Sequence, residues 1–282
     1  MVASAGDRAA APVVAATMVI LRDGVGGLEA YLQRRPRTMG FAGGLWAFPG
    51  GRVEEHDRDP AIDPHWTGPR PSAWAERLDV PADSARGLVV AACREAFEEA
   101  GLLLSDRPAE PGAAAAARHD LLDGRRSLAA ALADLGVRLD TARLRYWAWW
   151  VTPEGEPRRY DTRFFIADLP EGAVTSAEGL TEVEGDRWLP PERAAGDQTM
   201  LMLPPTRFTL QDLAAFPNAR EAMSAAEGRA IERIVPRLEG DELVMPWNER
   251  YPVPVPLRPA AGTGTPTGAR PRPAEPPAGT DR

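Results

Sequence analysis

Apolar and polar positions in the first third of the chain predict two antiparallel strands and a loop. The apolar, β-branched run at residues 13–21 predicts a strand, and the partner strand of a hairpin follows at residues 28–34. The glycine-rich loop after it ends in Phe48-Pro49-Gly50-Gly51. Residues 54 to about 84 are polar and proline-rich with no clear period, which predicts an irregular insertion.

The clearest helical pattern of the chain lies at residues 85–100. An apolar stripe of leucine and alanine runs along it, and Gly101 follows as a C-terminal stop. Residues 102–104 predict the start of another strand. Within a second insertion at about residues 106–140, residues 112–136 are alanine-rich and predict two short helices that break near Asp123-Gly124.

The remaining pattern predicts strands and helices in turn, and then an unstructured tail. Strands are predicted at residues 146–152, 163–169 and 186–189, and helices at 210–216 and 224–238. Residues 252–282, rich in proline and glycine, are predicted to be disordered, and residues 1–11 to be flexible. One α/β domain at residues 12–251 is therefore expected.

Composition narrows the function classes. Formal net charge is −8, which argues against a nucleic-acid binder, and every basic residue apart from histidine is arginine because the chain contains no lysine. The single cysteine, Cys93, excludes an intramolecular disulfide and a cysteine-rich zinc site. No long apolar run or secretory signal is visible, so we expect no membrane span and a cytoplasmic location.

Three acids stand out within the helical pattern. Glu95, Glu98 and Glu99 are spaced i, i+3 and i+4, so a helix would place them on one face. Clustered carboxylates repel one another unless a cation lies among them, and Mg²⁺ or Mn²⁺ prefers such oxygen ligands. The alternative, from spacing alone, is a solvated acidic face.

The sequence around these acids resembles the Nudix box. Residues 94–102, Arg-Glu-Ala-Phe-Glu-Glu-Ala-Gly-Leu, match the pattern Arg-Glu-U-x-Glu-Glu-x-Gly-U, in which U is aliphatic, and Phe48-Pro49-Gly50-Gly51 resembles the entry to the same box. The box departs from the usual spacing because an insertion splits it. Asp57 stands where a glutamate usually follows the glycine, so its equivalence to that glutamate is left open.

The position of the split is similar to that in the Nudix branch that cleaves coenzyme A or acyl-coenzyme A. Softer similarities to that branch occur at residues 150–153, 160–165 and 203–206. The resemblance implies a Nudix-type α/β/α sandwich with a mixed sheet and helical insertions. It implies a diphosphatase that cleaves a nucleoside diphosphate linked to another group, with a small-molecule nucleotide as substrate and a homodimer as an open alternative.

Site residues follow from the same resemblance. Glu95, Glu98 and Glu99, together with the backbone carbonyl of Gly50, are expected to bind Mg²⁺ or Mn²⁺. Glu98, Glu95 and Arg94 are expected to form the catalytic group, and Glu182 or Glu184 is a candidate further ligand or base, with an ordinary exposed acid as the alternative.

Substrate phosphates would be bound by arginine, since no lysine is present. The candidates lie near segments expected to frame the cleft: Arg34, Arg35, Arg37, Arg158 and Arg159. A solvated basic surface is the alternative for each. Trp147, Trp149 and Trp150 could stack on a base, but core positions are the favoured interpretation.

Three functions remain open from sequence. The leading hypothesis is a coenzyme A or acyl-coenzyme A diphosphatase. A second keeps the chemistry but changes the substrate to ADP-ribose, NADH or a dinucleoside polyphosphate. The third is a catalytically silent domain that binds a nucleotide as a regulator, against which the intact acid triplet argues.

Overall fold

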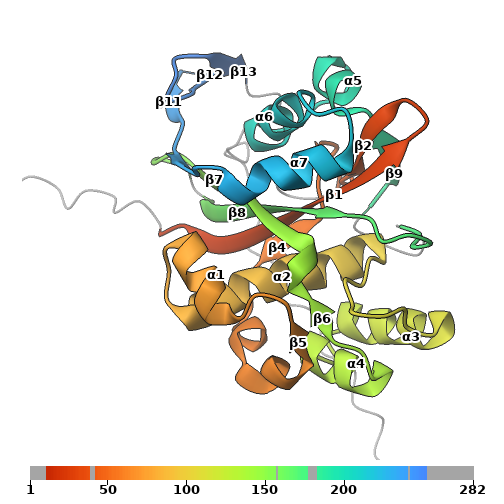
Figure 1. Ribbon diagram of the computed structural model, residues 1–282. Coiled ribbons are helices and arrows are strands. Elements are labelled where there is room, and N and C mark those ends of the chain that lie inside the picture. Colours follow the sequence, from red (N-terminus) through yellow and green to blue (C-terminus); the bar gives the residue numbers. More distant parts are fainter. Residues whose placement is uncertain (1–10, 39–41, 157, 177–182, 241, 253–282) are drawn as a thin grey trace, which may run out of the picture.

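A central mixed sheet lies between two layers of helices in the computed structural model (Figure 1). The structure describes residues 11–38, 42–156, 158–176, 183–240 and 242–252. The predicted flexible N-terminus and disordered tail fall almost entirely outside these residues.

The sheet is built around one long strand, β1 (Val13–Gly24). Its start pairs with β4 (Gly50–Arg52) and its end with β2 (Gly27–Arg34), both antiparallel. On its other edge β1 pairs in parallel with β8 (Tyr160–Asp168), which is antiparallel to β7 (Leu144–Val151). Short strands complete the sheet: β3 (Trp46–Ala47) and β9 (Gly185–Leu189) on β2, and β10 (Arg233–Ile234) on β7.

Apolar side chains of β1 point alternately to the two faces of the sheet, so both faces need to be covered. Met18 and Ile20 belong to the core beneath α2 (Ala82–Ala100), whereas Val19 and Leu21 belong to the core on the opposite face. That opposite face is covered by α6 (Pro204–Leu213) and α7 (Ala219–Ala225), with α5 (Pro191–Gly196) at its edge (Figure 1). A small sheet of β11 (Arg237–Glu239), β12 (Glu242–Val244) and β13 (Arg250–Pro252) lies beyond.

The first insertion is more regular than its sequence predicts. It contains two 3-10 turns, η1 (Glu55–Arg58) and η2 (Pro60–His65), the short strand β5 (Trp66–Thr67) and helix α1 (Pro71–Leu78). The prediction of an irregular segment at residues 54–84 is therefore wrong. The helix buries Trp74 and Leu78, four residues apart, and this single apolar pair is too short to stand out among the surrounding prolines.

The second insertion confirms two helices with a break between them. They are α3 (Pro111–Leu122) and α4 (Leu128–Leu135), and both pack on the side of α2 away from the sheet (Figure 1). After α4 the chain runs through β6 (Leu139–Asp140), which pairs with β5, and a 3-10 turn η3 (Thr141–Arg143) into β7.

Two other predicted elements are wrong. Residues 102–104 form no strand; Leu102 and Leu104 are buried as extended coil, and the next residue makes only an isolated bridge. The long helix predicted at 224–238 does not form. Helix α7 ends at Ala225, a 3-10 turn, η4 (Ala226–Gly228), follows, and the chain then pairs as β10 along the edge of β7. None of the helices in the described ranges is both long and apolar enough to cross a bilayer.

Candidate active site

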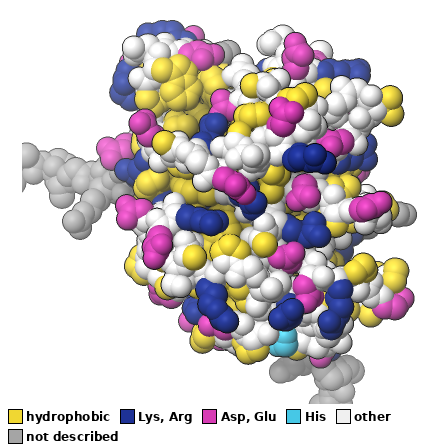
Figure 2. Space-filling view, in the orientation of Figure 1, with side chains coloured by type: hydrophobic (Ala, Val, Ile, Leu, Met, Phe, Trp, Pro, Cys, Tyr) yellow, Lys and Arg dark blue, Asp and Glu magenta, His cyan; other side chains and the backbone are white. Residues whose placement is uncertain are grey.

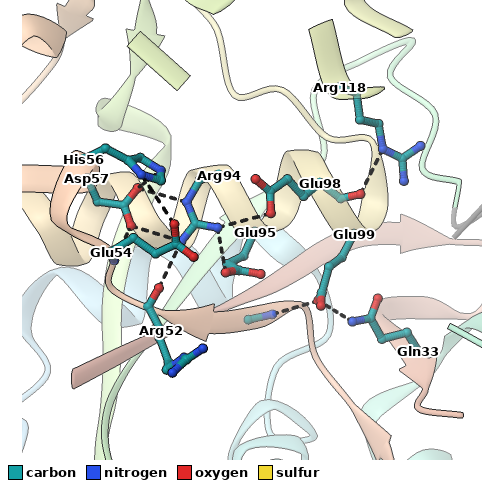
Figure 3. A network of polar contacts seen from close by, with 11 residues as sticks. Gln33, Arg52, Glu54, His56, Asp57, Arg94, Glu95, Glu98, Glu99 and Arg118 are labelled. Carbon is teal, nitrogen blue, oxygen red and sulfur yellow. Dashed lines mark hydrogen bonds and ion pairs between the residues drawn. The ribbon is translucent and has the colours of Figure 1, made fainter. Parts of the chain in front are cut away.

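The acid triplet lies on the last turns of α2, where the helix crosses the glycine strand β4 (Figure 3). The helix ends at Gly101, whose φ of 70° is left-handed and suits glycine. Glu99 is buried, while the side chains of Glu95 and Glu98 retain 12% and 16% of their exposure. The three side chains therefore lie near one another in a largely buried region at this end of the helix.

Asp57 anchors the arginine that precedes the triplet. Nε and Nη2 of Arg94 donate to the two carboxylate oxygens of Asp57 at 2.9 and 3.0 Å, and Nη2 also donates to the carbonyl oxygen of Arg52 at 3.0 Å. The Asp57 side chain is fully buried and that of Arg94 is 4% exposed. The bidentate pair joins the two halves of the split box, so Asp57 acts here as a positioning residue.

The remaining N–H groups of Arg94 reach the triplet itself. Nη1 donates to Glu95 Oε1 at 2.8 Å and to Glu98 Oε2 at 3.2 Å, and the second contact is an i, i+4 pair along the helix. Burial would lower the pKa of the Arg94 guanidinium, but its hydrogen bonds with Asp57 and the nearby carboxylates raise that pKa above its ordinary value. Arg94 therefore stays charged and fixes the direction of two acids.

Glu99 is held from the opposite side, by the sheet. The backbone N–H of Gly50 donates to Glu99 Oε2 at 3.0 Å, and the amide of Gln33 on β2 donates to the same oxygen. Sequence reasoning missed Gln33, which is 2% exposed; its signal is a glutamine directly after the apolar run at residues 30–32. Two strands and a helix thus converge on one carboxylate.

The electrostatics of the triplet favour an added positive charge. Burial, followed by the charge of Glu95, raises the pKa of Glu99 to about 8. Burial is also the main reason that the pKa of Glu98 rises to about 7, despite the opposing effect of Arg94. The carboxylates are thus costly to ionise together, and a cation between them would reverse that cost.

Gly51 packs so closely against the Glu95 side chain that a larger residue would not fit at this position. A Cβ atom placed on Gly51 would overlap the carboxylate of Glu95. We expect Gly51→Ala to displace Glu95 and to lower kcat at least tenfold with little change in Tm, since about 1.4 kcal/mol of lost transition-state stabilisation gives a tenfold rate change. The matched control is Gly196→Ala, where a Cβ would meet nothing within 4 Å. Equal activities of the two variants would contradict the assigned crowding.

Comparison with known proteins decides the family. A family model described as the NUDT19 Nudix domain matches residues 67–213. The chain belongs to this Nudix family. A crystal structure of a Nudix hydrolase from Alicyclobacillus acidocaldarius is 31% identical, with a TM-score of 0.61, covering 76% of this chain and 96% of that one. The Nudix sandwich expected from the sequence is therefore confirmed.

Two curated relatives carry the same name, acyl-coenzyme A diphosphatase NUDT19. The human protein is 31% identical over 244 residues, 71% of this chain and 64% of its own length. The chicken protein is 27% identical over 277 residues, 79% of this chain and 72% of its own length. The match thus spans less than two thirds of the human relative.

The first predicted arginine group lies at the end of β2, and one of its members is close to the triplet. Arg34 is the last residue of β2, directly after Gln33, and Arg35 and Arg37 follow the strand. The positive charge of Arg35 lowers the pKa of Glu99, although burial outweighs it. Glu184 accepts a hydrogen bond from the backbone N–H of Arg37 at 3.1 Å and lies 3.7 Å from Nε of Arg34. Of these residues only Arg35 has an electrostatic effect on the triplet among the described contacts, and the roles of all of them stay predictions.

The other predicted group lies on the turn between β7 and β8. Arg159 is buried and its Nε donates to the carbonyl oxygen of Thr152 at 3.3 Å, while Arg158 is exposed. Glu182, the alternative base, lies outside the described residues.

Two of the tryptophans that could have stacked on a base belong to the core instead. Trp147 is fully buried, and Trp150 stacks on Phe208 with ring centroids 5.9 Å apart.

Proposed function

We propose that this chain is a metal-dependent diphosphatase that hydrolyses coenzyme A or an acyl-coenzyme A. The observation that carries the proposal is the convergence of Glu95, Glu98 and Glu99 on one end of α2, braced by Arg94. The name shared by the human and chicken relatives, acyl-coenzyme A diphosphatase, supports the choice of substrate. Cleavage of the phosphoanhydride would give 3′,5′-ADP and a phosphopantetheine product.

The residues present fit a hard divalent cation. Among the described residues no three acidic, histidine or cysteine side chains already point at one position. Instead, Arg94 attracts two of the glutamates and Gln33 the third, so binding needs small side-chain rotations. Carboxylates with raised pKa values and the nearby carbonyl of Gly50 form an all-oxygen donor set, which suits Mg²⁺ or Mn²⁺. When bound, the metal would neutralise the diphosphate and lower the pKa of the attacking water.

The chain's own residues would orient these parts. Arg94 orients the carboxylates of Glu95 and Glu98 through hydrogen bonds, while the N–H of Gly50 and the amide of Gln33 orient that of Glu99. Arg35, beside Glu99, is the best placed of the sequence-predicted arginines to hold a substrate phosphate, because its Nε is buried without a hydrogen-bond partner within the described structure. Glu184 is the described candidate for the base.

Removal of divalent metal is expected to abolish hydrolysis. Coenzyme A turnover, followed by mass spectrometry of the products, should stop in EDTA and return when Mg²⁺ or Mn²⁺ is added in excess. The physical reason is that buried carboxylates alone would repel the diphosphate that they must approach. Full activity in EDTA would refute the metal-dependent mechanism.

A substrate panel separates the three functions. The proposal expects coenzyme A and acyl derivatives to have a higher kcat/KM than ADP-ribose, NADH and dinucleoside polyphosphates. Preference for one of the latter would keep the diphosphatase chemistry and replace the substrate. Tight nucleotide binding without turnover of any compound, with metal present, would favour a regulatory binding domain.

A further inference from the structure

A cavity of about 390 Å³ opens directly beside the catalytic helix, and its far wall comes from the second insertion. We call it the insertion cavity. Arg94 and Glu98 of α2 form one wall, and Glu54 and His56 form the next. Figure 3 shows these four side chains close to one another. The third wall is the end of α3, the turn and the start of α4: Leu121, Leu122, Gly124, Arg125, Arg126 and Ser127.

The turn between α3 and α4 fixes where its two arginines begin. The N–H of Gly124 donates to the carbonyl of Leu121 at 2.8 Å, and the N–H of Arg125 donates to that of Asp120 at 2.9 Å. Ser127 then caps α4 through its side chain, which accepts from the N–H of Ala130. Both ends of the turn are therefore tied to helices, and the arginines between them start from a defined backbone.

Aspartates brace the arginine pair without covering it. Arg125 donates to Asp120 at 2.7 and 3.0 Å and also pairs with Asp123. Arg126 lies 3.2 Å from the other oxygen of Asp120 and also pairs with Asp134. The side chains of Arg125 and Arg126 still keep 52% and 42% of their exposure. A guanidinium has five N–H groups, so each can bind a further anion while held in place.

We propose that the insertion cavity binds a terminal phosphomonoester of the substrate, separate from the diphosphate that is cleaved, and that Arg125 and Arg126 determine this specificity. The inference rests on the proposed function, which puts the scissile diphosphate at the acid triplet containing Glu98. Glu98 and the two arginines line the same cavity, so a ligand bound at the triplet could also reach the arginines. The lining suits a phosphorylated ribose, since Leu121 and Leu122 offer apolar contact and the arginine forks match phosphate oxygens.

The test compares coenzyme A with its 3′-dephospho form on the full-length protein with Mg²⁺. Wild type should show a kcat/KM for coenzyme A that is roughly tenfold to a hundredfold higher, the effect of one charge-assisted phosphate contact. The double variant Arg125→Ala/Arg126→Ala should remove most of this preference and leave the dephospho form within about twofold, while replacement of both arginines by lysine should restore part of it. Arg138→Ala, an exposed arginine of the same insertion outside the cavity lining, is the matched control.

Each result supports or overturns the proposal. Equal losses on both substrates would mean that the pair acts on the diphosphate, and no loss would mean that it binds no phosphate; either outcome overturns the inference and leaves the proposed function intact. If wild type cleaves neither compound, the proposed function fails. Calorimetry with 3′,5′-ADP and 5′-AMP then still tests the cavity, because the two ligands share the 5′-phosphate and only the first carries the additional 3′-phosphate. Wild type should bind 3′,5′-ADP at least tenfold more tightly than 5′-AMP, and the double alanine variant should bind the two ligands with similar affinity. Equal affinities of wild type for the two ligands would overturn the inference.

Discussion

Glu98→Gln is expected to lower kcat for diphosphate hydrolysis by roughly a hundredfold or more, a size typical for the loss of a strong electrostatic contact in the transition state. The side chain lies mid-triplet, and Arg94 directs it through a 3.2 Å hydrogen bond. Glutamine keeps its shape and removes the charge that would hold a metal ion. Steady-state rates at saturating substrate and Mg²⁺ measure the effect.

The matched control for Glu98 is Glu76→Gln, the same change on an exposed position of helix α1. This control should keep wild-type turnover, and both variants should keep the wild-type Tm within a few degrees. A Glu98→Gln enzyme within a few-fold of wild type would show that the catalytic acids have been wrongly assigned.

Asp57→Asn is expected to reduce the free energy of unfolding by about 3 kcal/mol, the lower end of the range for removing one partner of a buried ion pair. The lower end applies because Arg94 would keep Glu95 and Glu98 as partners. Asparagine can still accept one hydrogen bond, but it leaves a buried guanidinium without its bidentate carboxylate. Turnover should fall as well, since Arg94 would no longer orient the acids.

Urea unfolding monitored by circular dichroism measures this change. The control is Asp63→Asn, which breaks a bidentate pair with Arg86 in which the Asp63 side chain is 39% exposed. Water reaches the Asp63 carboxylate and screens this pair, so the variant should lose at most about 1 kcal/mol. If both variants were equally stable, Asp57 would not be what joins the two halves of the box.

The sequence predicts the central elements well because their patterns are long. The β-branched run of β1 and the helical stripe of α2 each bury one continuous set of side chains, and such sets are visible without a structure. Helix α1 and strand β10 escape prediction because each is short and is stabilised by contacts with distant parts of the chain, β10 by its pairing with Trp149 and Trp150.

The candidate site likewise has features that the sequence predicts and features that only the structure reveals. Spacing along one helix is enough to bring Glu95, Glu98 and Glu99 together. Contacts between separate elements are not encoded locally, and so the pairing of Asp57 with Arg94 and the approach of the Arg125 turn to Glu98 emerge only from the structure. Counting six positions after Gly51 finds Asp57, but only its burial and its partner reveal what it does.

The ion pair between Asp57 and Arg94 spans 37 positions of sequence. The segment between them can therefore vary in length as long as the ion pair holds both halves of the box in the same relative position. A pattern search that demands a fixed interval between the halves would pass over chains of this kind. A search for an acid six positions after the glycine, with any interval before the arginine, would retrieve them.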